Sequence, residues 1–325
     1  MPFHPPVLTA DLPHSSPHYH CRMWRAHGLG SRGRCARGEP SAQPKHCAHR
    51  GGVVSPSQPI IEAREVFKVF TAQGNRHDRR AFLALHDVNL AVDAGRFVAL
   101  VGPSGCGKST FLNMIAGLVR PTEGIVRYKG APVEGVNTDA GYITQDDNLF
   151  PWRTLQENVE VALEFRGVPA TGRRVEAGKY IAMVGLGGFE HHFPHELSGG
   201  MRKRAALIRT LIYEPDVVLM DEPFGPLDAQ TRVILQDELL KLWEGSGKSI
   251  LFVTHDLVEA IALADEIVMF SRAPGTIKRR YTVPISRPRD VFRIHAHPAF
   301  GDFYDQVWRD LKEEIIEVAL EVRER

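Results

Sequence analysis

This sequence has only short apolar runs, a net charge close to zero and few cysteines. Its apolar runs, such as 97–101, 217–220 and 250–253, have the length of strands and fall far below the roughly 18 residues that cross a membrane. We therefore expect no membrane-spanning helix. The 40 basic and 39 acidic side chains leave a formal charge of +1. That balance gives no general attraction to polyanions, so we expect no nucleic-acid partner.

Cysteine is limited to four residues, and three of them lie in the first 57. Cys21, Cys35 and Cys47 occur there with seven of the 15 histidines, but no Cys-x2-Cys pair exists. The irregular spacing argues against a structural zinc site. Cys106 has no evident partner, so the cysteine usage is typical of a reducing cytosol.

Residues 1–57 also differ from the rest in charge and pattern. They carry seven basic and two acidic side chains, so the net charge of +1 combines +5 in this segment with −4 elsewhere. They lack both a periodic apolar pattern and the continuous apolar core of a secretory signal. Such a segment buries too little surface to offset the entropy of ordering its backbone. We predict a disordered N-terminal extension over 1–57.

A phosphate-binding loop follows the first buried strand. The apolar run 97–101 predicts a parallel strand, and a helical pattern begins soon after it. Glycines there let backbone N–H groups point at a triphosphate, and the helix N-terminus adds its positive dipole. Lys108 is expected to reach the β- and γ-phosphates, and the Ser109 hydroxyl to bind Mg²⁺. The loop matches Gly-x4-Gly-Lys-Ser and consists of Gly102, Pro103, Ser104, Gly105, Cys106, Gly107, Lys108, Ser109 and Thr110.

Two further strands end in polar residues. The run 217–220 leads into Asp221 and Glu222, and the run 250–253 leads into Thr254 and His255. The carboxyl ends of parallel strands face the ligand crevice. Asp221 is suited to hold Mg²⁺, Glu222 to polarise the water that attacks the γ-phosphate, and His255 to sense that phosphate. The alternative is a surface turn with two solvated acids.

A second glycine-rich element lies at 197–201. Ser198 is placed as an N-cap, and Gly199 and Gly200 expose backbone donors at the start of a helix over 202–213. One nucleotide does not need two such cradles on one face, so a head-to-tail dimer is expected, with each second cradle closing on the partner's nucleotide. The apolar face of this helix comprises Met201, Ala205, Ile208 and Ile212, with Arg202 and Lys203 outside it.

In this order the motifs resemble the ATP-binding subunit of an ABC transporter, over about residues 60–285. The resemblance implies ATP and Mg²⁺ as cofactors, and Glu222, His255 and Gln145 as catalytic residues. Gln145, in the Q-loop 141–145, would lie at a hinge and touch Mg²⁺ or the attacking water. The resemblance further implies that Phe70 stacks on adenine and that Asp228 belongs to the D-loop. Ser198, Gly199, Gly200 and Met201 would cap the partner's γ-phosphate.

Four segments resemble the nitrate, sulfonate and taurine importers more narrowly. They are Ser-Gly-Gly-Met-Arg at 198–202, Asp-Glu-Pro-Phe-Gly at 221–225, Phe-Pro-Trp at 150–152 and Arg-Pro-Arg-Asp at 287–290. The resemblance implies a subunit that powers uptake of a small anion through a separate transmembrane permease. It would lie on the cytoplasmic face of the inner membrane, beside a second copy of itself, with a solute-binding protein as an indirect partner. Pro226 departs from the family, which usually has a small residue there.

The expected fold is α/β, with a P-loop parallel-sheet core, an antiparallel β subdomain and an inserted helical subdomain. We place the ATP-binding domain at 58–285 and the helical subdomain at about 146–212, with helices over 155–165, 173–184 and 202–213. A C-terminal appendage spans 286–325, with a helix over 300–322. Its apolar stripe would pack on its own domain or on a partner and contains Phe303, Val307, Leu311 and Ile315.

Three other functions remain possible on the sequence. A soluble ABC-type ATPase would usually carry a coiled-coil insertion or a second cassette, and neither pattern is present here. A P-loop kinase would have no use for the element at 197–201. A degenerate nucleotide sensor would not need Lys108, Asp221, Glu222 and His255 together.

Overall fold

The computed structural model describes residues 58–71 and 81–323, with side-chain environments up to residue 317. The predicted N-terminal extension and its cysteines and histidines lie outside the described residues. No helix in the described part is long and apolar enough to cross a membrane.

A six-stranded sheet forms the core, in the order β10-β9-β3-β8-β7-β6. Five strands run parallel, and β10 pairs antiparallel with β9 at one edge. The predicted strands at 97–101, 217–220 and 250–253 are three adjacent members of it. The strand bounds are β3 Phe97–Val101, β6 Ala140–Ile143, β7 Val217–Asp221, β8 Ser249–Val253, β9 Glu266–Phe270 and β10 Ile277–Thr282.

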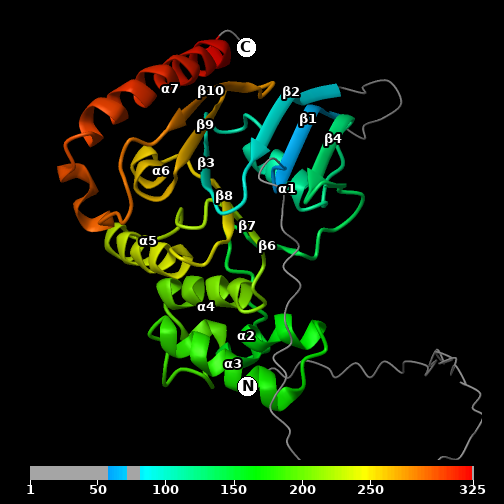
Figure 1. Ribbon diagram of the computed structural model, residues 1–325, viewed down its shortest axis with the longest axis vertical. Helices are drawn as coiled ribbons and strands as arrows, with labels where there is room; N and C mark the ends of the chain where they lie inside the picture. The colour runs from blue at the N-terminus through cyan, green and yellow to red at the C-terminus, as the bar shows by residue number, and fades with distance from the viewer. Residues whose placement is uncertain (1–57, 72–80, 324–325) are drawn as a thin grey trace, which may run out of the picture. The chain divides into compact units, whose positions relative to one another are not determined.

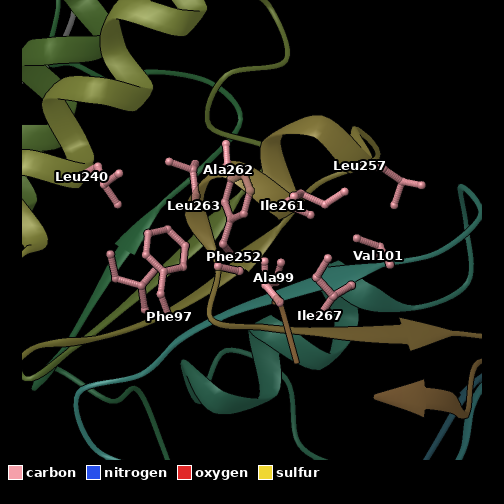
Figure 2. Packing of buried hydrophobic residues seen from close by; sticks show 14 of the residues in the cluster. Phe97, Ala99, Val101, Leu240, Phe252, Leu257, Ile261, Ala262, Leu263 and Ile267 are labelled. Carbon is pink, nitrogen blue, oxygen red and sulfur yellow. The ribbon is translucent and has the colours of Figure 1, made fainter. Parts of the chain in front are cut away.

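Both faces of this sheet are covered, which explains why β3 is apolar throughout. All five of its side chains are buried. Phe97, Ala99 and Val101 pack with Phe252 and the apolar side of α6, as Figure 2 shows. The two residues between them pack on the opposite side with α1, because successive strand residues point to opposite faces. The helices beside the sheet are α1 Lys108–Ile115, α5 Ala229–Trp243 and α6 Leu257–Leu263.

A second, antiparallel sheet has the order β2-β1-β4-β5. β1 pairs with β2 on one side and β4 on the other, and its buried residues share a core cluster with α1. The predicted antiparallel subdomain is therefore present. Its strands are β1 Ile61–Thr71, β2 Ala81–Val92, β4 Glu123–Tyr128 and β5 Ala131–Pro132.

Three helices inserted between β6 and β7 form a separate layer below the sheet (Figure 1). They share their own apolar cluster. α2 Leu155–Phe165 has the predicted bounds and starts with a capping box between Thr154 and Glu157. α3 Ala170–Met183 and α4 Gly199–Leu211 begin three residues earlier than predicted. For α4 the reason is Ser198, whose N-cap bond starts the helix at the next residue.

The C-terminal segment continues through η2 Val291–Ala296 into α7 Phe300–Arg323, which packs along α6. Phe303, Val307 and Leu311 join the core cluster of the main sheet, so this part of the predicted stripe packs on its own domain. Ile315 does not, since it is 41% exposed.

Buried Arg289 fixes the start of this segment. Its guanidinium donates to the carbonyl oxygens of Ile261 and Ala264 at 3.0 and 2.6 Å. These are carbonyls that the end of α6 leaves without helical partners.

Candidate active site

The phosphate loop connects β3 to α1 and depends on two glycines. Gly107 has φ +100 and caps α1, and a Cβ there would lie 2.5 Å from Leu85 Cδ2. Gly102 has φ +154, and a Cβ there would lie 2.8 Å from the Phe270 carbonyl oxygen. Both backbone angle and space therefore require glycine. The predicted strand-loop-helix context of this loop is confirmed.

Lys108 points back over the loop. Its ammonium is buried and donates to the carbonyl oxygens of Gly102 and Pro103 at 2.8 and 2.9 Å. Its Nζ also lies 3.6 Å from Cys106 Sγ. Burial raises the pKa of that thiol, and the nearby lysine opposes the shift. Cys106 is thus a packed neutral thiol inside the loop.

The hydroxyl and the carboxylate expected to bind Mg²⁺ are in contact. Asp221 is the last residue of β7, and Ser109 Oγ donates to its Oδ1 at 2.9 Å. Burial raises the pKa of Asp221, and the Ser109 bond opposes the shift. A hydroxyl and a carboxylate side by side are hard oxygen donors, which suit Mg²⁺. The residues present fit that ion.

Glu222 and His255 also meet at this edge of the sheet. β7 and β8 are neighbours, and His255 Nδ1 lies 3.2 Å from Glu222 Oε2. Glu222 has φ +44, a left-handed backbone that is strained for this residue type. Its amide is held by a bond to the Val253 carbonyl oxygen at 3.0 Å. The neighbouring strand therefore fixes the backbone of Glu222, and His255 is in contact with its carboxylate.

Gln145 reaches the same space. A methyl group built on Gly225 would lie 3.6 Å from Gln145 Nε2 and 3.9 Å from Glu222 Oε2. The structure therefore brings Gln145, which sequence reasoning had added only through the family resemblance, close to Glu222 and His255, which it had placed at the ends of parallel strands.

Two aromatic side chains line the outer end of the phosphate cavity. The cavity measures 220 Å³ and is lined by Phe70, Phe82, Lys108 and Glu222 among others. Phe70 and Phe82 are direct cross-strand partners of β1 and β2, and both are exposed. Sequence reasoning named Phe70 but missed Phe82. Phe82 could have been found from the pairing register of β1 and β2, because residues directly opposite one another on two paired strands lie on the same face of the sheet.

The second glycine-rich element lies away from the phosphate cavity, and its Ser198 and Gly199 are exposed. Ser198 Oγ accepts from the Met201 amide at 3.3 Å, so the predicted N-cap is confirmed. A Cβ on Gly200 would lie 2.7 Å from Thr231 Cγ2 in the first turn of α5. None of the residues 198–201 is among those lining the phosphate cavity of the described chain.

Asp228 caps α5. Its Oδ1 accepts from the amides of Thr231 and Gln230 at 3.0 and 3.1 Å, and these bonds lower the pKa of its carboxyl. Pro226 lies in the turn before it, where the Gly225 and Leu227 amides bond back within the turn.

Comparison with known proteins identifies the chain. A family model described as ABC transporter matches residues 85–225. An uncharacterized ABC transporter ATP-binding protein, MJ0412 of Methanocaldococcus jannaschii, is 44% identical over 79% of this chain and 92% of its own length. This chain is an ABC transporter ATP-binding protein.

Other relatives of this ABC protein carry substrate names. The taurine import ATP-binding protein TauB of Yersinia pestis is 46% identical over 62% of this chain and 78% of its own. The nitrate import ATP-binding protein NrtD of Synechocystis is 38% identical over 76% and 93%. A dimeric structure of the ATP-binding cassette MJ0796 with ADP and Pi has a TM-score of 0.61 at 33% identity, covering 70% of this chain and all of that one.

These findings confirm the family, the α/β cassette fold and the ATPase activity. The ABC protein binds and hydrolyses ATP. The roles of individual residues, and the domain bounds given above, stay predictions.

Proposed function

We propose that this ABC protein powers uptake of a small anion, such as nitrate, a sulfonate or taurine, through a separate transmembrane permease. Two named relatives support the importer class, because they import taurine and nitrate. The observation that carries the ATPase part of the proposal is the meeting of the phosphate loop, the Ser109–Asp221 pair and the Glu222–His255 pair at one sheet edge. The folded unit would comprise an ATP-binding domain over 58–285 and an appendage over 286–325.

The residues divide the work by their chemistry. Backbone amides of the loop and the Lys108 ammonium would bind the phosphates, and Phe70 would stack on adenine. Ser109, Asp221 and Gln145 would hold Mg²⁺. When bound, that ion supplies positive charge that neutralises the phosphate oxygens.

Glu222 would orient the attacking water as general base. Its carboxylate is held in direction by the strained backbone and by the contact with His255, whose ring would contact the γ-phosphate. Gln145 would touch the same water from the other side. Such positioning, together with electrostatic stabilisation of the transferred phosphoryl group, supplies most of the rate enhancement in phosphoryl transfer.

The second cradle would act on a partner copy. Ser198, Gly199, Gly200 and Met201 are exposed or half-buried and lie away from the chain's own phosphate cavity. A head-to-tail dimer would place them over the partner's γ-phosphate, with Asp228 near the interface. The dimeric MJ0796 cassette supports this arrangement.

A cleft beside the helical subdomain is where we expect the permease. It measures 590 Å³ and runs between the start of β6 and the end of α2. Leu118, Val136 and Phe165 line it and are 54, 67 and 79% exposed. Exposed apolar side chains at a cleft are typical of a protein interface. Docking there would hold the subunit at the cytoplasmic face of the membrane.

The Glu222→Gln variant tests the catalytic part. It should bind ATP with an affinity within about twofold of the unchanged chain, while kcat falls by about a thousandfold. In saturating Mg-ATP it should sediment as a dimer. Glu176→Gln, at an α3 residue whose side chain is 41% exposed, is the matched control and should behave as the unchanged chain. Near-normal turnover would remove Glu222 from the role of base, and a strictly monomeric variant would refute the dimer.

The transport part needs the membrane partner. The chain, purified with its permease, should pellet with membranes without detergent. Nitrate, sulfonates and taurine, each on its solute-binding protein, should then be compared for stimulation of ATPase activity. A chain that stays in the supernatant beside the permease would favour the soluble ATPase instead.

A further inference from the structure

The loop that carries Gln145 is held by basic side chains of a single helix. Lys203 Nζ, from the second turn of α4, donates to the carbonyl oxygens of Thr144, at 3.0 Å, and of Gln145. Two turns later along α4, Arg209 donates to the carbonyl oxygens of Asp147 and Asn148 at 2.9 and 2.7 Å. Arg202 adds an ion pair to the Asp147 carboxylate at 2.9 Å. Four of the five carbonyls of residues 144–148 are therefore bound by α4.

The burial of Lys203 is a feature that sequence reasoning did not predict. Lys203 was expected only to lie outside the apolar face of α4, and in the structure it is 7% exposed. Burial lowers the pKa of its ammonium to about 8, although Asp147 and Asp146 oppose the shift. Within the described residues, its hydrogen bonds go to the two loop carbonyls. An apolar side chain would fill this space without the cost of desolvating an ammonium group. A lysine that bears this cost therefore indicates that its two hydrogen bonds have a function.

Those two bonds change where the hinge lies. Gln145 was expected at the hinge between the sheet and the helical subdomain. The carbonyl oxygens of Thr144 and Gln145 are bonded to α4, which would place the pivot at the junction of Ile143, the last residue of β6, with Thr144. The helix that holds Gln145 also begins at Ser198. The side-chain amide of Gln145 and the glycine-rich element at 198–201 are thus both attached to α4 and should move with it.

We infer that Lys203 is a positioning residue for ATP hydrolysis, because it fixes the Gln145 backbone to α4 so that its amide is presented beside Glu222 when α4 moves. A movement that brings Ser198 to the partner's nucleotide then sets Gln145 in its own site at the same time. The inference rests on the proposed role of Gln145. It adds a residue that touches neither nucleotide nor water.

A double-mutant cycle tests the inference. Lys203→Met removes both bonds with little change of volume, and kcat should fall by about tenfold, because a small misplacement of a positioning group is costly. Gln145→Ala should lower kcat at least as much. The double variant should match Gln145→Ala within about twofold, since Lys203 acts through Gln145. Lys179→Met, an exposed lysine of α3, is the control and should leave kcat unchanged.

The outcomes separate the two proposals. If Gln145→Ala leaves kcat unchanged, the proposed role of Gln145 is wrong. If Gln145→Ala lowers kcat but the two single effects multiply in the double variant, Lys203 acts by a different route and the inference is overturned. An unchanged kcat in Lys203→Met overturns it as well.

A second measurement does not depend on turnover. Deuterium uptake of peptides over 144–149 should rise by about fivefold in rate in Lys203→Met, while peptides from α1 exchange as before. Equal uptake in both proteins would overturn the inference. If Lys203→Met does not fold, Lys203→Arg keeps the charge and at least two donors. Its kcat should stay within about threefold of the unchanged chain, and a tenfold loss with unchanged exchange over 144–149 would overturn the inference.

Discussion

Arg289 offers a direct test of how the C-terminal segment is attached. The side chain is 8% exposed, and it donates to the carbonyl oxygens of Ile285, Ile261 and Ala264 at 2.9, 3.0 and 2.6 Å. Arg289→Met keeps most of the apolar stem and removes all donors. The carbonyls at the end of α6 then lose both their partners and a favourable positive charge.

The magnitude follows from two opposing terms. Three hydrogen bonds from a charged donor contribute about 1.5–3 kcal/mol each. Against them stands the cost of burying the guanidinium, which lowers its pKa from the ordinary value to about 10, a shift equivalent to about 3 kcal/mol. The difference is a net destabilisation of about 1.5–6 kcal/mol, and we expect about 3 kcal/mol, in the lower half of that range.

Thermal unfolding, followed by circular dichroism, measures this loss. At roughly 2–3 °C per kcal/mol for a chain of this size, Tm should fall by about 6–9 °C in Arg289→Met. Arg293→Met is the control, because Arg293 is exposed one turn further on, and its Tm should change by less than about 1 °C. A Tm for Arg289→Met within about 1 °C of the unchanged chain would show that the buried guanidinium contributes no net stability.

Three other substitutions have clear expected results. Gly107→Ala should abolish ATP binding measured by equilibrium dialysis, because its Cβ would lie 2.5 Å from Leu85 Cδ2 at φ +100; unchanged affinity would mean that the loop shifts freely. Phe70→Ala should raise the Kd for ATP by about fivefold and that for inorganic triphosphate hardly at all, since stacking concerns the base; equal effects on both ligands would contradict the adenine role. Val307→Ala should lower stability in urea by about 2 kcal/mol, whereas a loss below about 0.5 kcal/mol would place α7 outside the cooperative core.

The sequence predicted the parts of the site whose positions depend on residues close to them along the chain. Three strands and their terminal residues could be read directly, because Asp221 and His255 follow apolar runs and parallel strands end at one edge. The cap at Ser198 is equally local. These features need only the chain's immediate neighbours in sequence.

Other features depend on partners far along the chain. Lys203 was expected outside the apolar face of α4, and nothing in the helix sequence indicates that the carbonyl oxygens of Thr144 and Gln145, 59 and 58 residues earlier, accept hydrogen bonds from it. Phe82 required the register of β1 and β2. Ile315 continues the apolar stripe of α7, but the residues of that stripe that pack into the core end one turn earlier, at Leu311.

The contact between Gly200 and Thr231 limits how this protein can be recombined with its relatives. The space beside Gly200 is filled by the methyl group of Thr231 in α5, so the two segments must be exchanged together. A chimera that takes 197–201 from one parent and 226–231 from another combines two segments whose packing at positions 200 and 231 has not been matched. A bulkier residue at 231 would push the glycine backbone outward, so an apparently conservative graft could alter the surface offered to the second subunit.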